Sequence, residues 1–471
     1  VERIIKADAF PAISNVEPSK DRVLLTGTIT VYVLYKPEEG QSIQCIRQIF
    51  DFDSSVNMPG VSTEGGLFSD ISVGFINVRV INSRKLSIKV GADVRVAAEN
   101  VGSFEVLKTG NSAIESLTES CKVFSFIGRN EGNIKVEEDI EISPANPPIG
   151  NYLYSFAEVK PTESKAIGNK VITKATLFVN TVYTRDDDGE IEFLQSEIPF
   201  THIFELQGVD EDSKCVIGMN VKNLKTEIYE NDAGENRIIA CECDIRCVCS
   251  AYKEEEMDYL IDAFSTEYEY KCDRKKINIC KDIEFIKVST MIKEMVDFEK
   301  DISRIFSSSG SLNVLDTYIE DNKLIIKGNL NVSMLAMMED GNIDSLESTL
   351  PFVISNNIEG QCEQCSIRVE LNIEGLNYMI AGSNSVEIRA NIGGVATIKH
   401  FGKIDALSDM VLDENKVKAK NNDYIILYYP SKDESIWEIA KKYNVKVESI
   451  KELNKCDGDI CTRNMILIPK K

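Results

Sequence analysis

One strand-like stretch occurs three times in this chain, and its recurrence limits the possible folds more than any other feature. The copies read VLLTGTITVYVLYK at Val23–Lys36, VITKATLFVNTVYT at Val171–Thr184 and LIIKGNLNVSMLAM at Leu324–Met337. Each alternates apolar and polar residues and is rich in residues that favour strands, which is the pattern of a long half-buried β-strand. We therefore predict three tandem β-rich units.

The same landmarks follow each copy of the stretch. An acidic turn that ends in glycine comes first, and a second glycine follows the next strand-like run. Glycine supplies the positive φ that tight hairpins need. The landmarks recur about 150 residues apart, as expected for whole repeated domains. They are Gly40 and Gly60, Gly189 and Gly208, and Gly341 and Gly360.

This spacing sets the predicted boundaries of a mainly β fold. We predict repeats at 1–148, 149–301 and 302–400, a polar linker with some helix at 401–422, and a small α+β module at 423–471. A short apolar segment opens each repeat, and we interpret these as short helices: Val1–Phe10, Ile149–Phe156 and Ile302–Ser307. The later two follow strand-like runs that have no counterpart before Val1. We therefore expect the sequence to be a piece of a longer protein, trimmed at its N-terminus.

The charge of the chain argues against two classes of partner. The formal net charge is −23, and such a chain would repel nucleic acid and anionic membranes. Solubility is the simplest explanation of the charge. No run approaches the roughly 18 apolar residues of a membrane span, so we expect neither nucleic acid binding nor membrane insertion.

Four of the 13 cysteines lie on one face of a single predicted strand. Cys241, Cys243, Cys247 and Cys249 occupy alternate positions together with Ile245. The matching strands of the other repeats carry aliphatic residues there, so we interpret these cysteines as small core hydrophobes rather than metal ligands. The odd number of cysteines, scattered without the spacing of a disulfide framework, favours a reducing compartment.

Nothing in the sequence forms a recognisable catalytic motif. His202 and His400 are the only histidines, and neither recurs in the other repeats. Asp186–Asp188 lacks the ligand spacing of an EF-hand, and Cys362–Cys365 is a lone C-x-x-C. We therefore predict a protein that is not an enzyme and has no catalytic residues, cofactor or metal.

The C-terminal residues form a strand-helix-helix-strand pattern. Tyr424–Tyr429 reads as a strand, Ser435 and Glu438 form a capping box, and Lys446–Leu453 is a second helix before the strand Met465–Ile468. The Ser-Ile-Trp-x-Ile-Ala-x-x-Tyr core and the Leu-Ile-Pro ending resemble a LysM domain. The resemblance implies binding of N-acetylglucosamine polymers by the loops before the first helix and after the second.

Both loops depart from the LysM pattern. Asp433-Glu434-Ser435 stands where the family has Gly-Asp-Thr, and Thr462-Arg463-Asn464 stands where it has Pro-Gly-Gln. Charge at the rim favours a protein partner over a neutral glycan, although ordinary solvated loop charges would look the same. The candidate partner-binding residues are Asp433, Glu434, Ser435, Ile436, Asn454, Asp457, Asp459 and Ile460.

The repeats, with their Ile198–Phe200 and Leu350–Phe352 segments and the bridge Leu260–Ser265, resemble SPOCS domains. SPOCS repeats followed by one LysM domain are similar to a family of spore coat morphogenetic proteins from endospore-forming bacteria. The resemblance implies a scaffold in the mother-cell cytosol at the forespore surface and in the spore coat. Its LysM domain would dock a SpoIVA-type coat ATPase, and other coat proteins would be further partners.

Two other functions remain open at this point. The LysM-like module could anchor the chain to the glycan of peptidoglycan or cortex. Alternatively, edge strands of the β-rich repeats could pair between copies, which would make the chain a self-associating exosporium or surface-layer protein.

Overall fold

The computed structural model describes residues 1–38, 42–62, 66–82, 84–100, 102, 114–359, 364–418, 425–431, 434–456, 458–459 and 465–469. The chain divides into two compact units. The first contains Val1–Val101, Ser125–Lys253 and Ile283–His400, and the second contains Gly102–Phe124, Glu254–Asp282 and Phe401–Lys471. Strands dominate the described residues, which confirms the predicted mainly β class.

Each repeat begins with a three-stranded antiparallel sheet, and the recurring stretch is its central strand, as predicted. The recurring strand is paired on both edges. Apolar and polar residues alternate along it because only one of its faces packs against a core. The sheets are β1 (Arg3–Ser19), β2 (Arg22–Lys36) and β3 (Gln44–Asn57); β7 (Ile149–Ile167), β8 (Lys170–Arg185) and β9 (Ile191–Glu205); and β13 (Ile302–Glu320), β14 (Lys323–Met338) and β15 (Ile343–Asn357).

The segments that open the repeats are strands, so the prediction of short helices there was wrong. They form the beginnings of β1, β7 and β13, which pair with the central strands over almost their whole length. The pairing register shifts near the start of each strand, between Ile4 and Lys6, between Ile149 and Asn151, and between Ile302 and Arg304. A bulge interrupts strict alternation, so these apolar segments lack the regular period that identifies a strand.

A second sheet packs on the first in each repeat and completes a sandwich. In the first repeat it consists of β4 (Leu67–Asn82) and β5 (Lys85–Ala98). In the other two it has three strands: β10 (Lys214–Glu230), β11 (Asn236–Ser265) and β6 (Ile114–Glu141); and β16 (Gln364–Ile380), β17 (Ser385–Val417) and β12 (Tyr268–Asp297).

These sheets differ from the predicted domain boundaries. β6 and β12 precede residues 149 and 302, yet they pair with strands of the second and third repeats. β17 continues to Val417 and so occupies most of the predicted linker, where Ile404 and Ala406 are buried. The polar composition of 401–422 concealed this strand because only one of its faces contributes to a core.

The predicted cysteine face is confirmed: Cys241, Cys243, Cys247 and Cys249 are at most 4% exposed and belong to the core of the second sandwich. The opposite face of β11 is also buried in part. Arg246 there donates to Glu131 Oε1 at 2.7 Å and to Ser69 Oγ at 3.3 Å, and Ser69 belongs to the first repeat. The repeats therefore pack against one another.

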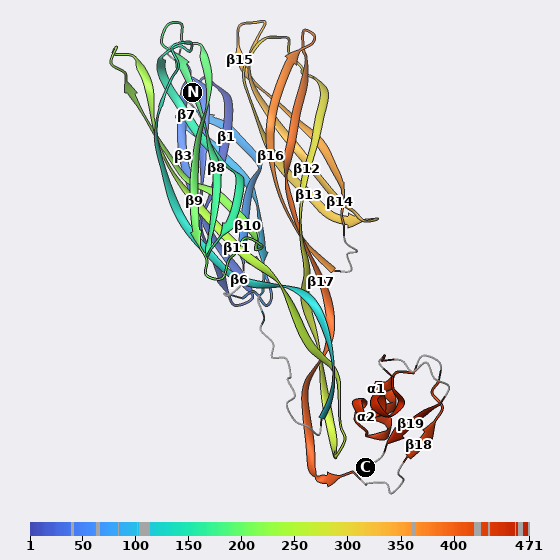
Figure 1. Ribbon diagram of the computed structural model, residues 1–471. Coiled ribbons are helices and arrows are strands. Elements are labelled where there is room, and N and C mark those ends of the chain that lie inside the picture. Colours follow the sequence, from blue (N-terminus) through green and yellow to red (C-terminus); the bar gives the residue numbers. More distant parts are fainter. Residues whose placement is uncertain are drawn as a thin grey trace. The chain divides into compact units, whose positions relative to one another are not determined.

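A shared core joins the three repeats in the first unit, where their long strands run side by side (Figure 1). Its buried members come from every repeat: Ile5, Tyr32, Leu34 and Ile43; Leu153, Tyr154, Val182 and Ile191; and Leu335. The body is thus held together by contacts between repeats as well as within them.

The second unit combines strand segments with the C-terminal module. Segments of β6, β11, β12 and β17 enclose two small cores, one around Tyr259 and one around Leu407. The module consists of β18 (Ile425–Tyr428), α1 (Ile436–Tyr443), α2 (Val447–Asn454) and β19 (Ile466–Pro469), in the predicted order. Neither helix of the described residues is long and apolar enough to cross a membrane.

Candidate functional site

The predicted partner-binding loops meet at the N-terminal end of α1. Ser435 is the N-cap, and its Oγ accepts a hydrogen bond from the Glu438 backbone N–H at 3.1 Å. The Glu438 carboxylate accepts the Ser435 N–H at 3.0 Å, and these hydrogen bonds hold the pKa of Glu438 below its usual value. The Asp459 backbone oxygen accepts the Ile436 N–H at 2.8 Å, which joins the two loops.

The two described loop carboxylates differ in their availability. Glu434 accepts hydrogen bonds from the Tyr428 hydroxyl and the Ser431 N–H, each at 2.8 Å, and so closes its own loop. Asp459 contacts Lys451 at 2.9 Å, but its side chain is 92% exposed. Asp459 is therefore the more accessible acid for a partner.

Two candidate residues are structural, because their side chains are buried. Ile436 is 1% exposed and packs in the module core. Asn454 is 3% exposed; its Nδ2 donates to the Ile450 and Leu467 carbonyls at 2.9 and 2.6 Å, and its Oδ1 accepts the Leu467 N–H at 2.7 Å. Asn454 therefore joins α2 to β19. Asp433, Asp457 and Ile460 lie outside the described residues.

An apolar stripe lies beside these loops, and the sequence analysis did not identify it as functional. Ile425, Leu427 and Tyr429 are 52%, 59% and 70% exposed. Alternate residues of a strand share a face, so the three side chains lie on the outer face of the β18 region, and we call them the β18 stripe. The sequence did contain a signal for this stripe. The strand predicted at Tyr424–Tyr429 has apolar or aromatic residues at every position, so it has no polar face for solvent.

The other side of the module packs against the end of β11. Trp437 Nε1 donates to Asp262 Oδ2 at 2.9 Å, and Lys441 Nζ lies 2.6 Å from the same oxygen. The Trp437 ring packs edge-on against Phe264, with ring centroids 5.0 Å apart. Burial opposes ionisation of Asp262, but the hydrogen bonds from Lys441 and Trp437 outweigh it and lower the pKa. The indole ring of Trp437 therefore makes an internal contact and is not available to bind a ligand.

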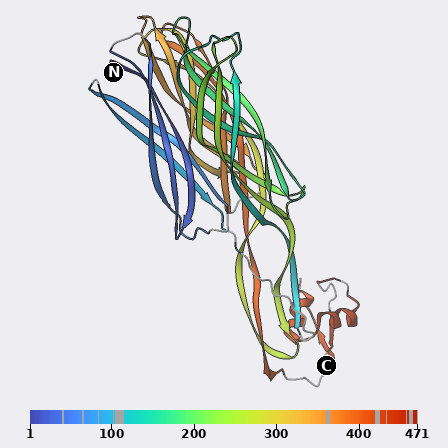
Figure 2. The same cartoon turned by 90° about the vertical axis from the view of Figure 1, so that its left-hand side faces the viewer.

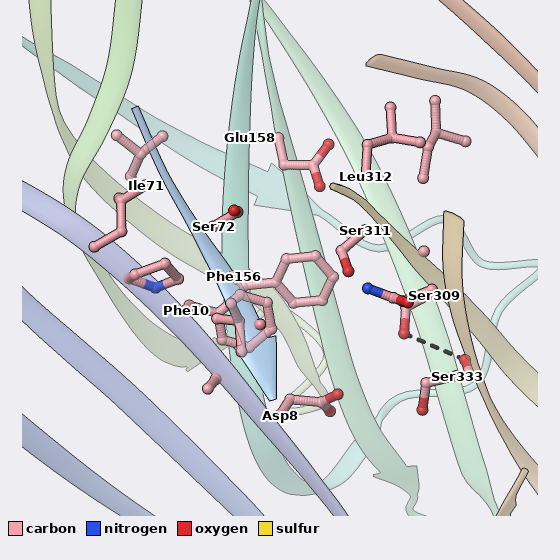
Figure 3. A pocket seen from close by; sticks show the side chains of 18 of the residues that line it. Asp8, Phe10, Ile71, Ser72, Phe156, Glu158, Ser309, Ser311, Leu312 and Ser333 are labelled. Carbon is pink, nitrogen blue, oxygen red and sulfur yellow. Dashed lines mark hydrogen bonds between the residues drawn. The ribbon is translucent and has the colours of Figure 1, made fainter. Parts of the chain in front are cut away.

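A cavity of about 740 Å³ lies within the first unit and is lined by all three repeats (Figure 3). Phe10 and Phe156 stack on one side, with ring centroids 4.5 Å apart. The Glu158 carboxyl faces the cavity; burial among protein atoms raises its pKa, which Lys160 partly offsets. Ser309 Oγ donates to the Ser333 carbonyl at 3.3 Å on the opposite side.

A buried polar network beside this cavity connects the repeats. Lys6 is 4% exposed, and its Nζ lies 3.2 Å from both Ser309 Oγ and Asp8 Oδ1. The Tyr154 hydroxyl donates to Asp8 Oδ2 at 2.5 Å, and burial together with this carboxylate raises the pKa of Tyr154. Each repeat supplies at least one member, so the network fixes how the repeats pack.

The residues considered for chemistry have structural contacts in the described part of the chain. His400 is 7% exposed and lies 3.3 Å from Glu284 and 3.6 Å from Cys365 Sγ, but Cys365 is disulfide-bonded and carries no thiol. Burial lowers the pKa of His202, which packs edge-on against Phe204. Cys362 lies outside the described residues. No group of acids, histidines and cysteines in the described ranges could hold a metal.

The fold and these sites define a tandem-repeat protein in which three packed β-sandwiches carry a small βααβ module. A family model described as SipL, SPOCS domain matches residues 1–81, 148–229 and 301–381, which together make up just over half of the chain. The chain belongs to this family, which indicates a sporulation protein related to the spore coat. No curated protein and no solved structure matches it.

Proposed function

We propose that this chain is a non-enzymatic scaffold that promotes encasement of the forespore by the spore coat. It acts in the mother-cell cytosol at the forespore surface and remains in the coat. Its C-terminal module is a LysM domain that docks a SpoIVA-type coat ATPase. The observation that carries the proposal is the SPOCS match in all three repeats, combined with the exposed surface of the module.

The module surface suits a protein partner better than a glycan. Trp437 is not accessible for stacking on a sugar ring, because it contacts Phe264 and Asp262, and the exposed ring of Tyr429 lies among aliphatic side chains. The β18 stripe offers three large apolar side chains that are more than half exposed, and Asp459 adds a charge at the neighbouring loop. An apolar centre with a charged rim is typical of protein interfaces.

Binding of the full chain to a purified SpoIVA-type ATPase tests this proposal. We expect Leu427→Asp and Tyr429→Ala each to weaken binding at least about tenfold, since aromatic and apolar anchors dominate interface energies. Asp459→Lys should weaken it less and mainly at low salt. Val353→Asp is the matched control, because Val353 is an exposed apolar residue of the first unit (57% exposed).

Two further assays with the same full chain test the two other functions. Co-sedimentation with insoluble peptidoglycan that chitin oligomers compete, without binding to the ATPase, would make the chain a wall anchor. Concentration-dependent assembly of the chain alone, unaffected by Leu427→Asp, would favour pairing between edge strands of the repeats and a self-associating exosporium or surface-layer protein.

A further inference from the structure

The cavity in the first unit lies where equivalent strands of the three repeats meet. Its lining comes mainly from the first strand of each repeat and from the strand that follows the first sheet in sequence. These strands are β1 and β4, β7 and β10, and β13 and β16. The long strands of the repeats lie side by side in both overall views (Figures 1 and 2). Each repeat therefore presents the same part of its fold to the cavity.

The pairing registers show which cavity residues are equivalent in the three repeats. Two positions of the opening strands, two residues apart, line the cavity in every repeat. The first position holds Asp8, Phe156 and Ser309, and the second holds Phe10, Glu158 and Ser311. Each position thus combines a carboxyl, an aromatic ring and a hydroxyl, one from each repeat (Figure 3).

These two positions are more polar than packing of the repeats requires. Aliphatic residues would pack there without the cost of desolvating a carboxylate. Asp8 belongs to the buried network with Lys6, but the charge of Glu158 is less well compensated. The Glu158 side chain is 52% exposed and faces the cavity, yet the surrounding protein raises its pKa. Lys160 lies 3.9 Å away and offsets this only in part, because its Nζ donates to the Ile373 carbonyl at 2.9 Å.

The lining as a whole favours a positively charged ligand that can form hydrogen bonds. Among the described lining residues, four are acids and one is a lysine; they are Asp8, Asp70, Glu158, Glu347 and Lys160. Walls of one sign concentrate ions of the opposite sign in a concave site. Ser333 Oγ is buried and has no hydrogen-bond partner in the described part of the chain, although buried hydroxyls usually have one. The stacked rings of Phe10 and Phe156 add apolar surface.

We propose that the cavity binds a small organic cation with an aromatic body. The ammonium group of the ligand pairs with Glu158, and its ring packs against Phe10 and Phe156. Hydrogen-bonding groups of the ligand reach Ser309 and Ser311 on the other side. The volume of about 740 Å³ lies within the roughly 300–1,000 Å³ that is usual for small-molecule sites. This binding is independent of the proposed docking to a coat ATPase.

Two probes of nearly equal shape test the proposal with the full chain. Tryptamine and tryptophol share an indole ring and a two-carbon chain, which ends in an ammonium group in the first and a hydroxyl in the second. Their affinities are measured by titration with saturation-transfer NMR. We expect tryptamine to bind at least about tenfold more tightly, since hydrogen bonds to charged groups are stronger than those between neutral groups.

Variants of two glutamates in the same strand locate the charge that is recognised. Glu158→Gln retains the shape of the side chain, so it should lower the affinity for tryptamine at least about tenfold and leave that for tryptophol unchanged. Glu163→Gln is the matched control, because Glu163 also belongs to β7 but is 62% exposed and contacts Lys174 instead of lining the cavity. Both affinities should be unchanged in that control.

A third variant places the probes in the cavity. Ser311→Phe fills part of it from the exposed side of β13 and leaves the sandwich core intact, so it should weaken binding of both probes.

Four results would overturn the proposal. Equal affinities of the two probes would show that the cavity does not select a cation. Equal losses in Glu158→Gln and Glu163→Gln would show general attraction to an acidic chain. Full affinity in Ser311→Phe would place the probes elsewhere, and the absence of saturable tryptamine binding would show that the cavity holds only water.

Discussion

Asp262 provides the sharpest test of the docked C-terminal module. Its side chain is 18% exposed, and it accepts Trp437 Nε1–H and contacts Lys441. In Asp262→Ala the indole N–H loses its acceptor in a partly buried site, which costs about 1–3 kcal/mol. Loss of the ion pair with Lys441 costs about 0–1 kcal/mol more, because the freed ammonium group is hydrated by water. Asp262→Ala should therefore weaken docking by about 1–4 kcal/mol, and Asp262→Asn should recover part of this loss because it retains an acceptor.

The assay is intrinsic fluorescence during urea unfolding of the full chain, because Trp437 is the only tryptophan. We expect emission of Asp262→Ala to shift to longer wavelength in native buffer and its transition to move to lower urea concentration. Asp405→Ala is the control. Asp405 in β17 is 51% exposed and lies 3.8 Å from Arg274 in β12. The free energy of unfolding should therefore change by no more than about 0.5 kcal/mol. Native emission identical to wild type in Asp262→Ala would refute the docked arrangement.

Three further predictions follow from single residues. The folded pKa of Asp262 lies below its usual value of 3.8, so its contribution to docking should be complete above that pH and be lost as the pH falls through the lowered pKa, seen as a red shift in an acid titration. Asn454→Ala should destabilise the module by about 2–4 kcal/mol in the same urea assay, since it removes three hydrogen bonds of about 1 kcal/mol each. Cys243→Val should cost less than about 1.5 kcal/mol by calorimetry, and because burial raises the pKa of the Cys243 thiol to about 12, native protein should resist thiol reagents at this position.

The sequence predicted the central strands because local pattern and tertiary role agree there. Even the small residues follow the repeat: Gly27 and Gly328 each lie opposite a phenylalanine of the next strand, and Ala175 occupies the same position in the second repeat. A Cβ on Gly328 would lie 2.4 Å from the ring of Phe352. The cross-strand ring fills the space that the missing side chain leaves.

The sequence could not predict which strands share a sheet. β6 and β12 fell within the predicted first and second repeats, because the strands with which they pair lie after the next repeat has begun. Register shifts at the starts of β1, β7 and β13 interrupt the alternation there, so these short apolar segments were not recognised as strands. Both errors have the same origin. Local periodicity indicates which side chains face inward, but it contains no information about which strand is the neighbour in the sheet.

The candidate site shows the same limit at the level of single residues. Asn454 was predicted to be a partner-binding residue at the end of α2, yet it is buried, whereas the preceding Leu453 is 40% exposed. The carbonyl and N–H of Leu467 both bond to Asn454, whose amide supplies a donor and an acceptor in one group. The docking of Trp437 on Asp262 likewise joins residues 175 positions apart. Asn454, which satisfies distant backbone groups, therefore looked like a surface candidate, whereas the exposed β18 stripe looked like an ordinary strand.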